Sequence, residues 1–357
     1  MTAFSLSGIR IAGIGSAVPR AVRTPQDEAN LFLGDNIDKL AQSTGVQQRH
    51  TARQLCASDL GTAAAKSVLS ALAWAEDGID LLVFVTQTPD HRLPANACLL
   101  QARLGLPQGC MAFDVNLGCS GFVYGLAQAG ALLALMGKGR RALLIVGDTI
   151  SRLVSPQDKS TVFLFGDGVS AVALENDEAA APMHFSLGTD GRGGSHLLVP
   201  AGGLRRPADP ATAERRPREG GNLRSDEDLL MNGAEVFAFT LRSVPDLVQG
   251  TLSAAAWSTD DVDFFLFHQA NAMMLRHLGK KLGIPEQKMP LSLDLYGNTS
   301  GASIPITMSC RLPDALRAAP RNLLMVGFGV GFSWGAAAVQ TDGVVMPEIV
   351  LVEEPSP

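Results

Sequence analysis

The sequence predicts an α/β fold in which one β/α unit occurs twice. Short apolar runs that are typical of buried strands alternate with longer stretches whose composition favours helices. The strand pattern of the first half returns in the second half with similar spacing. The chain has 357 residues, of which 46% are hydrophobic and 18% charged, so it can form a large core and is too long for one simple domain.

The first half supplies the elements of one complete unit. Residues 9–14 alternate between apolar and small or polar side chains, which predicts a strand, and apolar runs predict further strands at 81–85, 111–115, 143–146 and 169–174. Residues 95–104 are helical in composition. The stretch after Cys119, as far as Leu135, is rich in Ala, Gly and Leu, which favours a helix that is buried on all sides.

The second half repeats this order of elements. The apolar run at 264–267 corresponds to the run at 81–85, and the run at 323–326 corresponds to the run at 143–146. In each half, the second run begins about 60 residues after the first. Residues 333–339 correspond to the strand at 169–174. We therefore expect an internal duplication.

Composition and charge exclude several classes of function. The net charge is −6, and no run of basic residues is interleaved with aromatic residues, which argues against a nucleic-acid partner. No apolar run approaches the ~18 residues that span a bilayer, and the first 19 residues do not have the pattern of a signal peptide. The five cysteines are scattered without a CxxC pair, so we expect neither a metal site nor disulfides, and a cytoplasmic location.

Residues 200–228 separate the two halves and are rich in proline, glycine and charge. Their composition predicts a mobile surface loop. A lid, or a docking site for an anionic partner, is the functional alternative. The arginines of this segment are Arg205, Arg206, Arg215, Arg216, Arg218 and Arg224.

Cys119 is the candidate nucleophile, because it lies in a Gly-Cys-Ser-Gly turn between a predicted strand and a predicted helix. Main-chain N–H groups and the dipole at a helix N-terminus favour the reactive thiolate, and the flanking glycines permit a tight turn. A free cysteine can also be simply a small buried apolar residue. That second interpretation applies to the cysteines without such a turn, namely Cys56, Cys98, Cys110 and Cys310.

Two further polar residues lie where catalytic groups of α/β enzymes occur. His268 directly follows the predicted strand 264–267, and strand ends are common sites for functional side chains. Asn298 lies among small residues that predict a tight loop with the amide directed inward. Either residue could also be structural, since Asn-Thr-Ser turns occur in ordinary loops. The glycine loop 327–331 has neither the spacing of a dinucleotide site nor that of a phosphate loop.

Four motifs occur in a specific order: Gly-Cys-Ser-Gly at 118–121, His-Gln-Ala-Asn at 268–271, Gly-Asn-Thr-Ser-Gly at 297–301 and Gly-Phe-Gly-Val-Gly at 327–331. Together they resemble the β-ketoacyl-acyl-carrier-protein synthase III family of the thiolase-like superfamily. Similar motifs extend the resemblance over nearly the whole chain, at 44–46, 88–91, 113–115, 165–168 and 232–237.

The resemblance implies a thiolase-like duplicated αβαβα fold in five layers. It predicts an N-terminal half at 1–180 that carries the cysteine, a connecting segment at 181–230, and a C-terminal half at 231–357 that carries the histidine and the asparagine. It also implies a homodimer and no metal or redox cofactor. The implied partners are acyl carrier protein and coenzyme A thioesters.

The reaction implied by the resemblance is a decarboxylative condensation in two steps. Cys119 would take an acyl group from a thioester, and a malonyl-type thioester would then lose carbon dioxide and attack the acyl-enzyme. His268 and Asn298 would donate hydrogen bonds to the enolate oxygen, each lowering the barrier by about 3 kcal/mol. The N–H groups of Cys119 and Val330 would form an oxyanion hole. Asn271, Gly329 and Gly331 would line the substrate site.

Several positions depart from the family pattern. Lys39 and Lys159 occupy the positions of a tryptophan and an arginine that hold the adenine of coenzyme A, and a lysine cannot stack as a planar group does. Recognition of coenzyme A is therefore open, and a carrier-bound donor is favoured. Met273 replaces an arginine that docks the carrier. Nearby basic residues could substitute for it or form only a solvated helix face: Arg276, Lys280 and Lys281.

Two departures concern the acyl site itself. Leu93 occupies a pocket position that the partner subunit supplies and that is usually aromatic, so a longer or different acyl chain would fit. Val330 replaces a glycine of the oxyanion loop and keeps the N–H group, while its side chain limits the available backbone angles.

These departures predict an accessory condensing enzyme of lipid or secondary metabolism, ahead of a housekeeping initiation enzyme. A different enzymatic hypothesis is acyl transfer to a hydroxyl or amine without decarboxylation, with His268 as general base. A third hypothesis is a non-catalytic partner subunit of a related synthase, although such subunits usually lose the catalytic residues that this chain keeps.

Overall fold

The protein, seen here in a computed structural model that describes residues 1–32 and 36–355, is built around two sheets. One sheet has the strand order β17 (Val350–Val352), β2 (Ile9–Pro19), β8 (Gly168–Asn176), β7 (Arg141–Asp148), β5 (Leu81–Val85) and β6 (Met111–Val115). The other has the order β1 (Thr2–Leu6), β9 (Met183–Thr189), β16 (Ser333–Thr341), β15 (Arg321–Gly329) and β14 (Phe264–Phe267).

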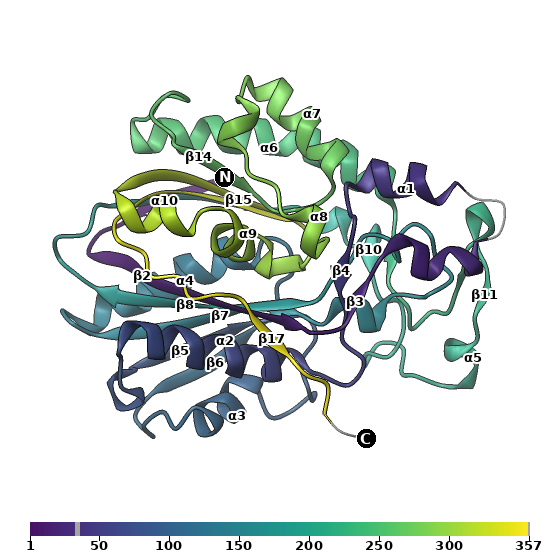
Figure 1. Cartoon of the computed structure of the whole chain (residues 1–357), viewed down its shortest axis with the longest axis horizontal. Helices are drawn as coiled ribbons and strands as arrows, with labels where there is room; N and C mark the ends of the chain where they lie inside the picture. Colours follow the sequence, from purple (N-terminus) through teal and green to yellow (C-terminus); the bar gives the residue numbers. More distant parts are fainter. Residues whose placement is uncertain (33–35, 356–357) are drawn as a thin grey trace.

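Helices form three layers around these sheets (Figure 1). Helices α4 (Gly121–Met136) and α9 (Ser303–Arg311) lie between the sheets. Helices α2 (Ala57–Leu72) and α3 (Asn96–Arg103) cover the outer face of the six-stranded sheet, while α6 (Gly233–Ala255) and α7 (Ala272–Leu282) cover the five-stranded sheet. The five layers confirm the predicted architecture.

Shorter elements connect the layers or extend from them. They are β3 (Val22–Arg23), α1 (Ile37–Thr44), β4 (Arg49–His50), β10 (Leu197–Leu198), α5 (Pro210–Ala213), β11 (Arg216–Pro217), β12 (Leu223–Arg224), β13 (Leu230–Met231), α8 (Leu293–Tyr296) and α10 (Pro313–Ala318). No helix in the described parts of the chain is long and apolar enough to cross a membrane.

Strand pairing reveals the duplication that the sequence predicts. In the first half β5 runs parallel to β7, with Leu81 opposite Ala142, and β7 runs antiparallel to β8. In the second half β14 runs parallel to β15, with Phe264 opposite Leu323, and β15 runs antiparallel to β16. The two units have the same strand directions and each adds a helix to the central layer.

Helix α4 packs between the sheets because its side chains are mostly apolar and several of them are very small. A Cβ atom at Gly121 would lie 2.7 Å from a methyl group of Val85, and one at Gly125 would lie 2.7 Å from a methyl group of Leu144. These glycines therefore let the helix approach the strands closely, while Phe122 fills the core beside them. The prediction of a helix hidden on all sides holds for its first ten residues but is wrong for its C-terminal end, where Leu135 is 86% exposed.

Three strands of the two large sheets were not expected from the sequence, and neither were the short strands of the two-stranded sheets. Strands β1 and β9 pair with each other in antiparallel register, with Phe4 opposite Phe185, and β17 pairs with β2. Their sequences are short or interrupted by polar residues such as His184 and Ser186, so they lack a continuous apolar run. Exposed or half-buried positions occur along each of these strands, which explains the weak signal.

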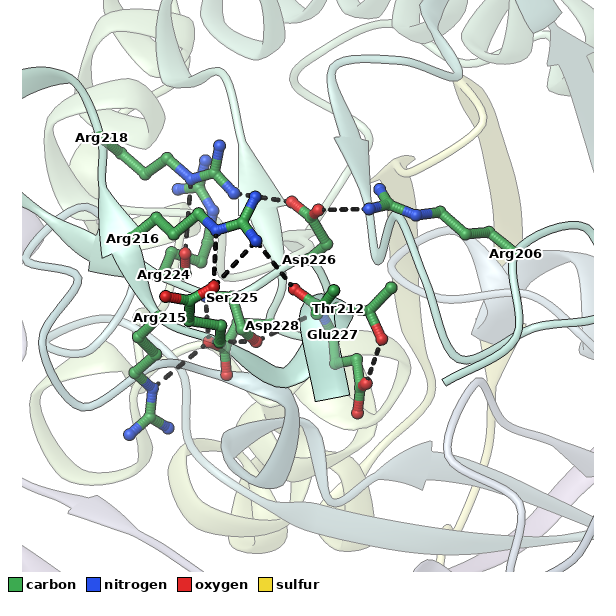
Figure 2. A network of polar contacts seen from close by, with 12 residues as sticks. Arg206, Thr212, Arg215, Arg216, Arg218, Arg224, Ser225, Asp226, Glu227 and Asp228 are labelled. Atoms are coloured by element: carbon green, nitrogen blue, oxygen red, sulfur yellow. Dashed lines mark hydrogen bonds and ion pairs between the residues drawn. The ribbon is translucent and has the colours of Figure 1, made fainter. Parts of the chain in front are cut away.

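The structure differs from the mobile loop predicted at 200–228. This arginine-rich segment contains α5 and the ribbon of β11 and β12, and its charges pair with one another (Figure 2). Asp226 forms ion pairs with Arg206 at 2.7 Å and with Arg218 at 2.6 Å. Arg224 forms an ion pair at 2.6 Å with Asp158, whose side chain is fully buried. Composition misled here because it counts charges without showing that they neutralise each other.

Candidate active site

Cys119 lies in the turn between β6 and α4, two residues before the helix begins. The residue is 8% exposed. The glycine loop at the end of β15 passes directly over it, because a Cβ atom at Gly329 would lie 2.7 Å from Cys119 Cβ and 2.9 Å from its Sγ. Only a residue without a side chain leaves the thiol uncovered at this position.

The electrostatic surroundings of Cys119 differ from those expected for a helix N-terminus. Burial, followed by the nearby Asp148 carboxyl, raises the pKa of the Cys119 thiol to about 12. Hydrogen bonding from the Ser300 side chain and from the N–H groups of Val330 and Cys119 acts in the opposite direction. The sequence predicted that main-chain donors would stabilise the thiolate. This prediction is wrong for the net pKa shift, because desolvation of the thiolate outweighs the main-chain donors.

His268 follows β14, and its main-chain N–H donates to Val326 O at 2.8 Å, which fixes it at the strand end. Its Nδ1 lies 2.8 Å from Ser303 Oγ, and that hydroxyl accepts the N–H of Gln269 at 3.3 Å. The direction of the bond to Nδ1 depends on the ring tautomer, and donation from the Ser303 hydroxyl corresponds to the tautomer with its proton on Nε2. Burial lowers the pKa of His268 to about 3, so the ring is neutral at physiological pH.

Asn298 is held by hydrogen bonds on its main chain and side chain. Its N–H donates to Leu164 O at 2.9 Å, and its carbonyl accepts the N–H of Gly166 at 3.0 Å. The side-chain Oδ1 accepts the N–H of Ser300 at 3.0 Å, while Nδ2 makes one long contact with Ala270 O at 3.4 Å. The acceptor end of the amide is thus engaged, and a donor remains for a ligand.

Two cavities meet at Cys119. The larger has a volume of about 380 Å³ and is lined mainly by aliphatic side chains with a few polar groups. The smaller, of about 70 Å³, contains His268 and Asn298. The thiol therefore faces an apolar chamber on one side and two hydrogen-bond donors on the other. The smaller cavity is further lined by Leu164, Phe165, Met231, Val236, Met274 and Phe328.

Four other predicted residues border these cavities. Asn271 and Gly329 line the smaller cavity, and Val330 lines the larger one together with Gly331. The side chain of Asn271 also caps α7 by accepting the N–H of Met274 at 2.8 Å. The structure thus brings the core of the predicted site together from four separate motifs.

The remaining predicted residues lie outside both cavities. Lys39 is exposed on α1, and Lys159 is half-buried beside the arginine-rich segment, where its N–H donates to Asn222 Oδ1. Leu93 is 83% exposed, so it contributes nothing to the site of its own chain. The three basic residues of α7 are also exposed, and Lys281 donates to Leu241 O at 2.8 Å. They are Arg276, Lys280 and Lys281.

Sequence reasoning missed three residues close to the thiol. Asp148 is completely buried at the end of β7, Gln87 lines the larger cavity, and Ser303 orients His268. A weak signal existed for the first two, since each follows a predicted strand and parallel strands end at the same edge of a sheet. Ser303 lies two residues beyond the motif at 297–301, and sequence alone does not show which serine faces the ring.

Comparison with known proteins gives one consistent family. Residues 113–191 match the family described as 3-Oxoacyl-[acyl-carrier-protein (ACP)] synthase III, and residues 252–341 match its C-terminal part. A β-ketoacyl-[acyl-carrier-protein] synthase III from Mesorhizobium japonicum is 36% identical over 337 residues, which cover 92% of this chain and 98% of the relative. The protein of that name from Desulfitobacterium hafniense is also 36% identical, over 93% of this chain and 97% of its own.

A solved structure is similar over almost the entire length. The crystal structure of a 3-oxoacyl-(acyl-carrier protein) synthase from Burkholderia xenovorans LB400 is 42% identical, has a TM-score of 0.92 and covers 99% of both chains. The fold, the sequence identity and the order of the motifs therefore all indicate the same family. The chain belongs to the 3-oxoacyl-[acyl-carrier-protein] synthase III family of condensing enzymes.

Proposed function

We propose that this protein forms carbon–carbon bonds by decarboxylative condensation of a Cys119-bound acyl group with a malonyl-type thioester. The observation that carries the proposal is the meeting of two cavities at Cys119. One cavity can hold an acyl chain, and the other places His268 and Asn298 beside the thiol. This division suits a reaction whose two substrates bind one after the other.

In the first step the sulfur of Cys119 attacks the carbonyl carbon of an acyl thioester. The bond to the donor's sulfur breaks, and the acyl group remains on the enzyme while the donor leaves as a thiol, taking up the proton that Cys119 lost. The N–H groups of Cys119 and Val330 support the developing oxyanion. A raised thiol pKa means that proton loss accompanies substrate binding or attack rather than preceding it.

In the second step a malonyl-type thioester loses carbon dioxide. The electron pair of the broken carbon–carbon bond moves onto the thioester oxygen as an enolate, which His268 Nε2–H and Asn298 Nδ2–H stabilise as donors. The enolate carbon then attacks the acyl-enzyme, and Cys119 leaves as a thiolate. A neutral histidine suits this role, because burial holds the pKa of His268 near 3.

We further propose a carrier-bound donor and a homodimeric, cytoplasmic enzyme that uses acyl carrier protein and coenzyme A thioesters without a metal or redox cofactor. Lys39 is exposed and offers no planar surface for adenine. Arg276 borders an open hollow of about 630 Å³ near the N-terminus of α7, where an acidic carrier could dock. Strand β6 forms a sheet edge, and the exposed Leu93 suits a contact in a partner's pocket.

Intact-protein mass spectrometry tests the first step. Wild type and Cys119→Ala are incubated with acetyl, medium-chain and long-chain acyl groups, on coenzyme A and on carrier protein. We expect a mass gain of one acyl group in wild type that is absent from Cys119→Ala. An adduct that persists in Cys119→Ala, or the absence of an adduct from every donor, would contradict the assignment of the nucleophile.

A further inference from the structure

The larger cavity beside Cys119 is not uniformly apolar. Ile150, Leu153, Leu197 and Val199 give it an aliphatic lining, as expected for an acyl chain. The carboxamide of Gln87 interrupts that lining next to the nucleophile. In an apolar pocket a small number of placed polar groups usually determines the orientation and identity of the ligand.

A buried carboxyl fixes the main chain at Gln87. Asp148 Oδ1 accepts the Gln87 N–H at 2.6 Å and the Thr86 hydroxyl at 2.9 Å, and it lies 3.3 Å from the Thr88 hydroxyl. The Thr88 hydroxyl in turn accepts the N–H of Thr149 at 2.9 Å. The ends of β5 and β7 are therefore tied together, and Gln87 has a defined position at the cavity wall.

The carboxamide of Gln87 lies against the residue that precedes the nucleophile. A Cβ atom at Gly118 would be 2.1 Å from Gln87 Oε1, so this side chain occupies its position only because residue 118 is glycine. Within the described parts of the chain, the carboxamide has no hydrogen-bond partner, although it borders the cavity. A partly buried amide is stabilised only when a ligand or solvent satisfies it.

We infer that Gln87 selects acyl groups that carry an oxygen substituent, a hydroxyl or a carbonyl, close to the thioester. An amide can donate to either group and accept from a hydroxyl, which matches this chemistry. Asp148 is the positioning residue for this contact. The inference rests on the proposed acylation of Cys119, because the acyl chain must enter the larger cavity.

The test compares rates of Cys119 acylation by butyryl, 3-hydroxybutyryl and acetoacetyl groups, each carried on acyl carrier protein and differing only at the third carbon. In wild type we expect the 3-hydroxybutyryl or acetoacetyl group to react about 10-fold faster than the butyryl group. In Gln87→Met, which keeps the length of the side chain, this ratio falls to about 1 while butyryl transfer continues. The comparison between the two oxygenated donors shows whether the hydroxyl or the carbonyl is selected.

Butyryl transfer in Gln87→Met also reports that the variant is folded. As a matched control, Gln108→Met makes the same substitution at an exposed position outside both cavities, and we expect it to leave the ratio unchanged. Equal rates for the three donors in wild type, or an unchanged ratio in Gln87→Met, would overturn the inference while leaving the proposed function intact. Failure of all three donors to acylate Cys119 would overturn both.

Discussion

At the scale of single residues, the burial of Cys119 opposes its role as a nucleophile. Because burial raises the pKa of its thiol to about 12, the thiolate fraction rises with pH across the whole accessible range. We predict that alkylation of Cys119 by iodoacetamide accelerates about 10-fold per pH unit between pH 7 and 9, without a plateau. Peptide mapping separates this site from the exposed Cys98, which serves as the reference thiol. A plateau below pH 8 would show an activated thiolate instead.

His268 provides a second prediction at this scale. Its pKa is lowered to about 3, so the ring stays neutral from pH 8 down to pH 5 and retains the Nε2 proton throughout. Decarboxylation should therefore not decline through the usual histidine range near pH 6.5. The pH profile of carbon dioxide release, measured on enzyme that is already acylated, checks this point. A loss of activity centred near pH 6.5 would mean that the ring takes up a proton in the working enzyme.

Ser303 is expected to act through His268 rather than on the substrate. Ser303→Ala removes the hydroxyl that engages Nδ1 and leaves the ring proton free to occupy either nitrogen. We predict that carbon dioxide release falls about 10-fold, whereas acylation of Cys119 is retained. Equal losses in the two steps would indicate a general structural defect.

At the scale of elements, apolar runs predicted the strands that are buried on both faces and the helix after Cys119, but not the buried helix α9. The runs at 81–85 and 264–267 match β5 and β14, because a strand covered on both sides needs a continuous apolar sequence. Strand β1 and its partner β9 escaped prediction, because each is partly exposed and lacks a continuous apolar run. The site was partly predictable because Cys119 and His268 each follow a strand that the apolar pattern had indicated.

Other site residues could not be identified from sequence, because their roles depend on contacts between distant segments. Asp148 meets Gln87 and Thr86 only when β5 and β7 lie side by side. The order within the arginine-rich segment likewise depends on pairing, in this case of Arg224 with Asp158. Composition alone cannot distinguish such paired charges from solvated ones.

This ion pair gives a prediction for the arginine-rich segment. Arg224 is 12% exposed and Asp158 is fully buried, so Arg224→Met leaves a buried carboxylate without its ion-pair partner. We predict a loss of about 3 kcal/mol in unfolding free energy by urea denaturation, partly recovered in the double variant with Asp158→Asn. As the control, Arg192→Met removes an exposed pair and should leave the unfolding free energy nearly unchanged, because solvent screens that pair. Similar losses in both single variants would contradict this account.

At the scale of the whole molecule, two sheets and three helical layers place the nucleophile and the donors on different halves of the chain. Cys119 lies in the first half, while His268 and Asn298 come from the second, so the site exists only when both halves pack together. The prediction of an N-terminal half at 1–180, a connecting segment at 181–230 and a C-terminal half at 231–357 remains a proposal about folding units.

The proposed homodimer gives a prediction at this scale. Strand β6 is a sheet edge, and its first residue Met111 is 47% exposed. Light scattering of the wild-type protein should give about twice 37.5 kDa. Met111→Lys should weaken association, whereas Leu135→Lys, which alters another exposed apolar side chain, should not. A monomer at micromolar concentration in the wild type would contradict the proposal.

The most direct test of the central claim separates the two chemical steps. Enzyme is acylated at Cys119, and carbon dioxide release from malonyl-carrier protein is measured for wild type, His268→Ala and Asn298→Ala. If these residues stabilise the enolate, each variant should lose about 100-fold or more in release while retaining acylation. Release at the wild-type rate in both variants, or its absence from the wild type with every acyl donor, would contradict decarboxylative condensation at this site.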